Sequence, residues 1–155
     1  MCPYVYETAV SPHLASKLEG NPIDFTKLMQ AYNSVLETYD YVTAEGSGGI
    51  LCPLRHDGQE ISLTDFVKAG ELSCLIVADA GLGTINSVVL THYYMMSHNI
   101  SVKGIIFNNF EPGNRLHEDN LEMCEDMTGL KVLACVKKGD TDLDMSFESL
   151  EALYE

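Results

Sequence analysis

The sequence predicts an α/β fold in which helices cover both faces of a mostly parallel sheet, a three-layer sandwich. Segments of strand length, such as residues 73–81 and 102–110, contain continuous apolar runs, as in strands that are buried on both faces. Helical patterns alternate with these segments along the chain, which favours a parallel sheet. A chain of 155 residues is long enough for one domain with a substantial core. We therefore expect a single domain over residues 1–155.

The first two helices are expected over residues 11–20 and 24–39. Ser11 and Pro12 are typical of a helix start, and Gly20 ends that segment. Residues 24–39 carry apolar side chains at helical spacing, which indicates an amphipathic helix.

A short strand and a third helix are expected next. Residues 41–44, "YVTA", are rich in residues that favour strands, and we expect this strand to end at Glu45. Ser62 and Asp65 are spaced as a capping box, which predicts a short helix over residues 62–70.

The second half of the chain alternates regularly between strands and helices. Gly129 is placed to end a helix in the left-handed conformation. The pattern predicts strands over residues 73–81, 102–110 and 131–136, and helices over residues 84–98, 114–129 and 146–155.

Composition excludes several classes of function. The formal net charge is −14 and only nine residues are lysine or arginine, which argues against nucleic-acid binding because that affinity depends on basic side chains. No apolar run approaches the ~20 residues that span a bilayer, and the N-terminus lacks the pattern of a signal peptide. The five cysteines show no metal-binding or disulfide spacing. We expect a cytoplasmic protein without a membrane partner.

Three predicted strand ends carry unusual polar residues. Glu45 is followed by Gly46, Gly48 and Gly49, the segment "DAGLGTIN" precedes a helix, and "NNFEPGN" follows a strand. The carboxyl ends of parallel strands form the binding edge of such a sheet. Glycines before a helix let backbone N–H groups face an anion.

These residue types suit a nucleotide–magnesium site. Acidic residues at strand ends, such as Glu45 and Asp79, can hold Mg²⁺ directly or through water, and the amide of Asn108 suits the edge of a purine. Simpler explanations stay open: an acid can be merely solvated, Gly81 and Gly83 can serve a tight turn, and Asn108 can cap a turn.

Four segments resemble the dethiobiotin synthetase family, the ATP-dependent ligases of biotin biosynthesis. They are, in the family's order, "PY" with "SPHLA", then "YDYVTAEGSGGILCPL", "LIVADAGLGTINSVVLT" and "VKGIIFNN". The acid–glycine segment and "LGTIN" are the most specific. The resemblance corresponds to the C-terminal two-thirds of the family's sequences, and it implies a fold like that of P-loop NTPases and a homodimer.

The resemblance implies a role for each matching residue. Glu45 matches a glutamate that holds Mg²⁺ beside the ATP phosphates, and Asn108 matches the asparagine that reads adenine. The turn formed by Gly46, Ser47, Gly48 and Gly49 matches a segment near the phosphates and the substrate's amino groups, so that Gly48 serves nucleotide and substrate. Asn86 matches a residue that faces the substrate of the neighbouring subunit. No catalytic side chain is identified.

The implied reaction joins CO₂ to 7,8-diaminopelargonate as a carbamate, which ATP phosphorylates before ring closure to dethiobiotin. Such chemistry requires neutralisation of phosphate charge and accurate positioning more than covalent catalysis.

One part of the family pattern is missing from these residues. The family's phosphate-binding loop ends in Gly-Lys-Thr, and no GxxxxGK[ST] pattern occurs in the 155 residues. We expect unpaired strand edges where that loop's strand would lie, and an isolated chain that is inactive and binds nucleotide weakly. Two alternatives stay open: a non-catalytic dimerising module, and a relative of the ATP-dependent amide ligases of cobalamin synthesis.

Overall fold

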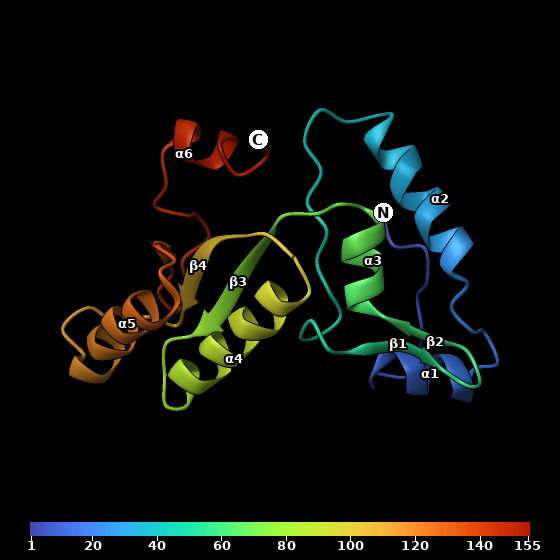
Figure 1. Cartoon of the computed structure of the whole chain (residues 1–155), viewed down its shortest axis with the longest axis horizontal. Coiled ribbons are helices and arrows are strands. Elements are labelled where there is room, and N and C mark those ends of the chain that lie inside the picture. Colours follow the sequence, from blue (N-terminus) through green and yellow to red (C-terminus); the bar gives the residue numbers. More distant parts are fainter. The chain divides into compact units, whose positions relative to one another are not determined.

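The computed structural model describes residues 1–155, and it divides the chain into two compact units (Figure 1). The first unit comprises Met1–Leu72 and the second comprises Ser73–Glu155. The expectation of one domain over the whole chain stays a prediction.

The first unit combines three helices with a small antiparallel sheet. Its elements are α1 (Pro12–Leu18), α2 (Phe25–Leu36), β1 (Pro53–His56), β2 (Glu60–Ser62) and α3 (Leu63–Ala69). β1 pairs with β2, α1 packs against β1, and α2 contacts α3, as Figure 1 shows. The buried side chains of Ile23, Leu54 and Ile61 form the core of this unit.

The three helices predicted for this unit are confirmed, and one of the two predicted caps is present. The Asp24 side chain accepts a hydrogen bond from Lys27 N at the start of α2. Ser62 and Asp65 form the predicted capping box of α3. At α1, Pro12 occupies the first turn as expected, but Ser11 makes no side-chain cap bond.

Strands were harder to predict than helices in the first unit. Residues 41–46 form no regular secondary structure, so the prediction of a strand ending at Glu45 is wrong for this structure. A strand is stable only beside a neighbour, and the strand pairing of this unit is that of β1 with β2. This hairpin was not predicted, although Asp57 and Gly58 at its turn are a recognised hairpin signal.

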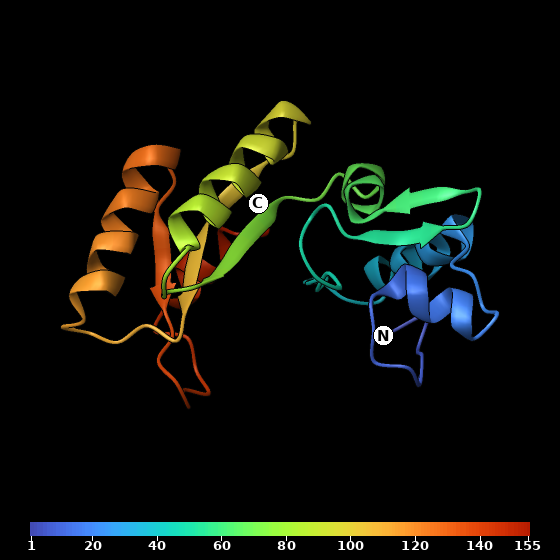
Figure 2. The same cartoon turned by 90° about the horizontal axis from the view of Figure 1, so that it is seen from below.

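The second unit is an α/β unit with a parallel sheet, which confirms the predicted fold class. Its elements are β3 (Cys74–Asp79), α4 (Thr84–Ser97), β4 (Val102–Asn108), α5 (Arg115–Thr128), β5 (Val132–Cys135) and α6 (Phe147–Glu151). The strands are parallel in the order β3–β4–β5. α4 and α5 run beside the strands and pack against each other (Figure 2). Gly129 ends α5 with φ +71°, as predicted.

The central strand holds the core, whereas one edge of the sheet is open. Ile105 and Phe107 of β4 are completely buried. β3 has β4 as its neighbour on one side only, so its other edge is open. On the face of the sheet opposite the buried Ile76, the β3 side chains of Leu75 and Val77 are 37% and 66% exposed. Unpaired backbone N–H and C=O groups at a sheet edge favour the addition of another strand. The expectation of an unpaired strand edge is thus met at β3.

The sheet register places two predicted site residues side by side. Asp79 at the end of β3 is aligned with Asn108 at the end of β4. Both residues therefore lie at the carboxyl edge of the parallel sheet, where α/β proteins bind ligands.

No helix in the structure has the length and apolar character required to cross a membrane.

Candidate functional site

The predicted metal ligand lies in an exposed turn of the first unit. Glu45 is exposed and its carboxylate has no hydrogen-bond partner within the protein. Behind it, Gly48 N donates a hydrogen bond to Gly46 O over 3.0 Å. The carboxylate is therefore accessible to a cation, but no contact of its own fixes it in place.

The three glycines after Glu45 differ in whether the structure requires glycine at their positions. Gly48 has φ +104°, a conformation that glycine adopts easily and other residues do not. A Cβ at Gly46 would lie 2.5 Å from a terminal methyl carbon of Leu63, whereas a Cβ at Gly49 would meet no atom within 4 Å. The positive φ thus explains Gly48, a side chain at Gly46 would require the end of the Leu63 side chain to shift, and Gly49 has no packing reason.

This turn borders a groove of the first unit. The groove has a volume of about 510 Å³, and its lining includes Glu45, Gly46 and Ser47. Its walls are rich in aromatic side chains, namely Tyr4, Tyr6, Tyr32 and Phe66. The structure thus brings three of the predicted site residues to one groove, and Gly48 and Gly49 follow them in the same turn.

In the second unit, the start of α4 has features of an anion site. Gly83 precedes the helix with φ +91° and provides no side-chain cap. Thr84, the first helical residue, is 6% exposed, and its Oγ1 has no hydrogen-bond partner. The first N–H groups of a helix lack partners within the helix, and the helix dipole attracts negative charge there. A carboxylate or phosphate would therefore bind favourably at this point.

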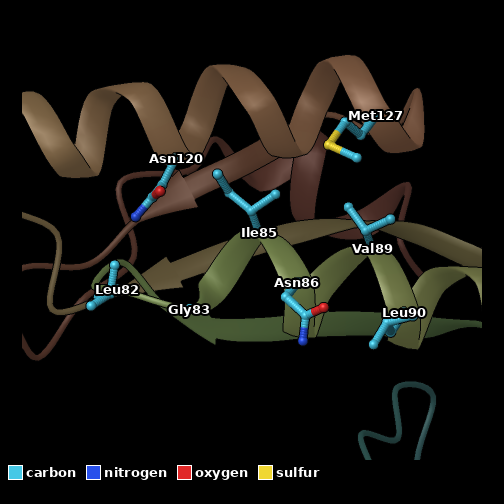
Figure 3. Close-up of a pocket in the computed structure, with 8 residues that line it drawn as sticks. All are labelled: Leu82, Gly83, Ile85, Asn86, Val89, Leu90, Asn120 and Met127. Atoms are coloured by element: carbon cyan, nitrogen blue, oxygen red, sulfur yellow. The ribbon is translucent and has the colours of Figure 1, made fainter.

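Asn86 lies in the first turn of α4, beside a shallow groove of about 430 Å³ (Figure 3). Ile85 and Val89 point toward α5, whereas Asn86 and Leu90 project from the other side of α4. Asn86 is exposed, so its amide is accessible to a ligand or to another protein chain.

Asn108 combines a fixed backbone with a free side chain. Its backbone carbonyl accepts a hydrogen bond from Ala80 N over 2.9 Å, and the preceding Phe107 is completely buried. The side chain is exposed and makes no hydrogen bond within the protein. An amide in this state can both donate to and accept from a ligand.

The carboxylate of Asp79 accepts hydrogen bonds within the protein, as a capping role would require, and its possible role as a magnesium ligand stays a prediction. Its Oδ1 accepts a hydrogen bond from Asn109 Nδ2 over 2.9 Å, and its Oδ2 accepts one from Gly81 N over 3.3 Å. These bonds, that of Asn109 first, hold the pKa of Asp79 below its usual range, with a smaller contribution from His117. Asp79 therefore organises the turn that leads into α4.

Asn120 of α5 has a similar role that sequence reasoning missed. It is 3% exposed, and its Nδ2 donates hydrogen bonds to the carbonyls of Ala80 and Gly81 over 2.8 and 2.9 Å. A detectable signal was its spacing of four residues from Cys124, which places a polar residue on the core face of the helix. Buried polar side chains require partners, and Asn120 finds them in the β3–α4 turn.

The protein provides few metal ligands of its own. No three histidine, cysteine, aspartate or glutamate side chains lie close enough together to hold a metal ion. This arrangement does not fit a metal centre built entirely from protein. It does fit Mg²⁺ bound with ATP, because Mg²⁺ usually takes one or two carboxylates and completes its coordination with phosphates and water.

The candidate residues fall into two groups, each within one unit. Glu45 and residues 46–49 belong to the first unit, and Asn86 and Asn108 belong to the second. The second group lies where the parallel strands end and their helices begin.

Comparisons with known proteins agree on one family. A protein-family model described as an AAA domain matches residues 1–141. An ATP-dependent dethiobiotin synthetase of Brachyspira hyodysenteriae is 48% identical over 156 residues, covering 100% of this chain and 70% of that protein.

Clostridial proteins of the same name are also similar. The one from Clostridium botulinum strain Alaska E43 is 40% identical, covering 98% of this chain and 66% of that protein. The one from Clostridium novyi is 45% identical, covering 89% and 58%. The chain thus spans 58% to 70% of the length of these three relatives.

Proposed function

The chain belongs to the dethiobiotin synthetase family, and on this premise we propose that it contributes to an ATP-dependent ligase that forms dethiobiotin. The observation that carries the proposal is 48% identity over the whole chain with a protein named for this activity. The names of the relatives favour this function over a non-catalytic module and over a ligase of cobalamin synthesis.

The proposed reaction uses 7,8-diaminopelargonate, CO₂ and ATP. An amine attacks CO₂ and loses a proton, which gives a carbamate. The carbamate oxygen takes the γ-phosphoryl group of ATP and releases ADP. The second amine then attacks the carbamate carbon and loses a proton, phosphate leaves, and the cyclic urea of dethiobiotin is formed. The protein has to position the reactants and stabilise negative charge.

We assign the nucleotide to the carboxyl edge of the sheet. The free amide of Asn108 has the donor and acceptor that the edge of adenine requires. The family resemblance assigns Glu45 and Gly48 to the phosphates, and the exposed, unpaired carboxylate of Glu45 would hold Mg²⁺. When bound, this ion would neutralise phosphate charge.

The diamino acid is assigned to the glycine turn of residues 46–49 and, through the homodimer proposed below, to the start of α4 of the neighbouring subunit. Residues 46–49 would lie near its amino groups. The partner-free Thr84 Oγ1 and the uncapped N-terminus of α4 support binding of its carboxylate, with Asn86 in the same turn.

A homodimer is part of the proposal. Apolar side chains are exposed on and beside the same part of α4: Leu82 is 93%, Leu90 58% and Tyr93 73% exposed. Apolar surface of this kind marks protein interfaces. We infer that a second copy covers it and brings Asn86 to the substrate of its neighbour.

The phosphate-binding loop has to come from residues other than these 155. The open edge of β3 supports the proposal that a strand leading to such a loop pairs there. A cytoplasmic location is proposed as well, supported by five cysteines that are all free thiols.

Reconstitution tests the proposed function. The chain is mixed with a polypeptide that carries a Gly-Lys-Thr phosphate loop and its strand, and dethiobiotin is measured with ATP, CO₂ and diaminopelargonate. We expect product from the mixture and none from the chain alone. Glu45→Ala should lower turnover in the mixture by about 100-fold or more, the scale seen for groups that stabilise transferring phosphoryl charge.

Glu37→Ala is the matched control, since Glu37 is another exposed carboxylate of the same unit. It should leave turnover unchanged. Full activity of Glu45→Ala would refute the role of Glu45, and micromolar binding of MgATP by the chain alone in calorimetry would refute the need for a separate phosphate loop.

A further inference from the structure

Two adjacent asparagines at the end of β4 have opposite environments. The Asn108 side chain is free, whereas the Asn109 side chain donates its hydrogen bond to Asp79 over 2.9 Å. Both residues are exposed. The chain thus has one amide available to a ligand, directly followed by an amide that is used internally.

Asn109 also has an unusual backbone conformation. Its φ is +56°, in the left-handed region that non-glycine residues adopt rarely and at a cost. Asparagine adopts this region more often than most other non-glycine residues, and a side-chain contact can hold it there. The bond to Asp79 is a contact of this kind.

The backbone on both sides of this residue is fixed. Asn108 O accepts a hydrogen bond from Ala80 N, and Phe110 N donates one to Val136 O, both over 2.9 Å. Phe110 is 8% exposed. The backbone is thus held at Asn108 and at Phe110, and the turn at Asn109 between them determines the direction in which the chain continues after Asn108.

Asp79 is itself held by the turn that it organises. Its second oxygen accepts from Gly81 N, and a Cβ at Gly81 would approach that oxygen to 3.0 Å, so glycine allows this close contact. Asn120 holds the same turn from α5 through the carbonyls of Ala80 and Gly81. One connected network thus reaches from α5 to the residue after Asn108.

We propose that Asp79 and Asn109 are positioning residues, which orient the Asn108 amide and thereby set the preference of this site for adenine over guanine. The proposal rests on the proposed function, because it requires Asn108 to read the base. An amide presents one donor and one acceptor. The edge of adenine offers N6–H₂ and an acceptor nitrogen, whereas the corresponding edge of guanine offers two acceptors, O6 and N7.

Orientation is decisive for this discrimination. An amide that rotates freely can turn its NH₂ group toward guanine O6 and donate a hydrogen bond to it. A fixed amide oxygen would instead face O6, and two acceptors form no hydrogen bond with each other. Loss of the Asp79–Asn109 pair should therefore weaken the preference for ATP over GTP more than it weakens binding of the triphosphate.

The test is the ratio of dissociation constants for MgGTP and MgATP, measured with the 155-residue chain in the mixture described above. Asn109→Gly keeps the backbone conformation accessible and removes the bond to Asp79. We expect it to lower the preference for ATP about threefold to tenfold, the equivalent of one lost hydrogen bond. Asn108→Ala should bring the ratio close to one.

Two further variants separate positioning from general stability. Asp79→Ala should lower the preference as Asn109→Gly does, and Asp79→Asn should retain more of it, because an amide oxygen can still accept from Asn109. If Asn109→Gly fails to fold, the two Asp79 variants decide the question. Circular dichroism and thermal unfolding establish the folded state of each variant.

Asn99→Gly is the matched control. Asn99 follows α4 and also has a left-handed backbone, with φ +57°, but no part in the proposed site. It should leave the ratio unchanged.

The outcomes are distinguishable. Equal binding of ATP and GTP by the wild-type mixture, or an unchanged ratio in Asn108→Ala, would overturn base reading by Asn108, and with it this inference. A lost preference in Asn108→Ala together with an unchanged one in Asn109→Gly and Asp79→Ala would overturn the positioning role alone.

Discussion

The two polar segments that sequence reasoning treated alike are organised very differently. At the end of β4, the backbone of Asn108 is fixed by the buried Phe107 and by a hydrogen bond from Ala80 N, directly after β3. Residues 41–46 precede an equally suggestive turn, yet they form no strand, and Glu45 is exposed without a partner. Each follows an apolar run in the sequence. What differs is the presence of an adjacent strand.

This comparison shows what positions a strand-end residue. β4 has neighbouring strands on both sides. At its end, Asn108 O accepts a hydrogen bond from Ala80 N after β3, and Phe110 N donates one to Val136 O after β5. Residues 41–44 have no such neighbour within the first unit. The side chain of a polar residue at a strand end is thus positioned for binding only where neighbouring strands hold the backbone of that residue.

The largest effect on stability is expected from truncating a buried side chain of β4. Phe107→Ala removes a completely buried ring, and we expect it to lower the free energy of unfolding by about 3–5 kcal/mol. Val42→Ala, in the segment without a strand, should cost less than about 1 kcal/mol because Val42 is only half-buried. Urea unfolding measures both values, and similar losses would contradict the difference drawn between the two segments.

A smaller effect is expected within the glycine turn. Gly48→Ala places a side chain at φ +104° and should cost about 1 kcal/mol or more. Gly49→Ala should change stability by less than about 0.5 kcal/mol, since no atom lies near its Cβ position. If the reconstituted mixture nevertheless loses activity with Gly49→Ala, the space at Gly49 serves a ligand. Equal stability of the two variants would refute the structural reading of Gly48.

The smallest effect concerns pH. The hydrogen bonds from Asn109 and Gly81 lower the pKa of Asp79 in the folded protein. In the unfolded chain, the pKa of an aspartate is about 3.9. The stabilisation is therefore complete above the unfolded pKa and is lost as pH falls through the folded one.

The stability difference between the wild type and Asp79→Asn should thus be constant above about pH 5 and shrink below about pH 4. Chemical unfolding at a series of pH values measures it. Asp126→Asn, at an exposed carboxylate of α5, is the control. A difference that stays constant down to pH 2 would show that the bonds to Asp79 do not contribute as described.

Local signals predicted the helices well. The capping box of Ser62 and Asp65 and the left-handed Gly129 both occur where expected. These features depend on residues within one or two turns of each other, so a short stretch of sequence contains all the necessary information.

Strands and site contacts were predicted less completely. The three strands of the parallel sheet were found from their apolar runs, but the β1–β2 hairpin was missed and a strand was assigned to residues 41–44. Asn109 and Asn120 were not recognised as partners of the β3–α4 turn. Their bonds join residues 30 to 40 positions apart, and no local pattern indicates such pairs.

The sequence by itself determined the α/β class, the helix boundaries set by caps, and the family, because these depend on local pattern and on motifs such as "LGTIN". Only the tertiary structure decided that Asp79 is bound by Asn109 while Asn108 remains free. The reason is physical: a side chain's availability depends on which distant group satisfies its hydrogen bonds, and that is settled when strands and helices pack.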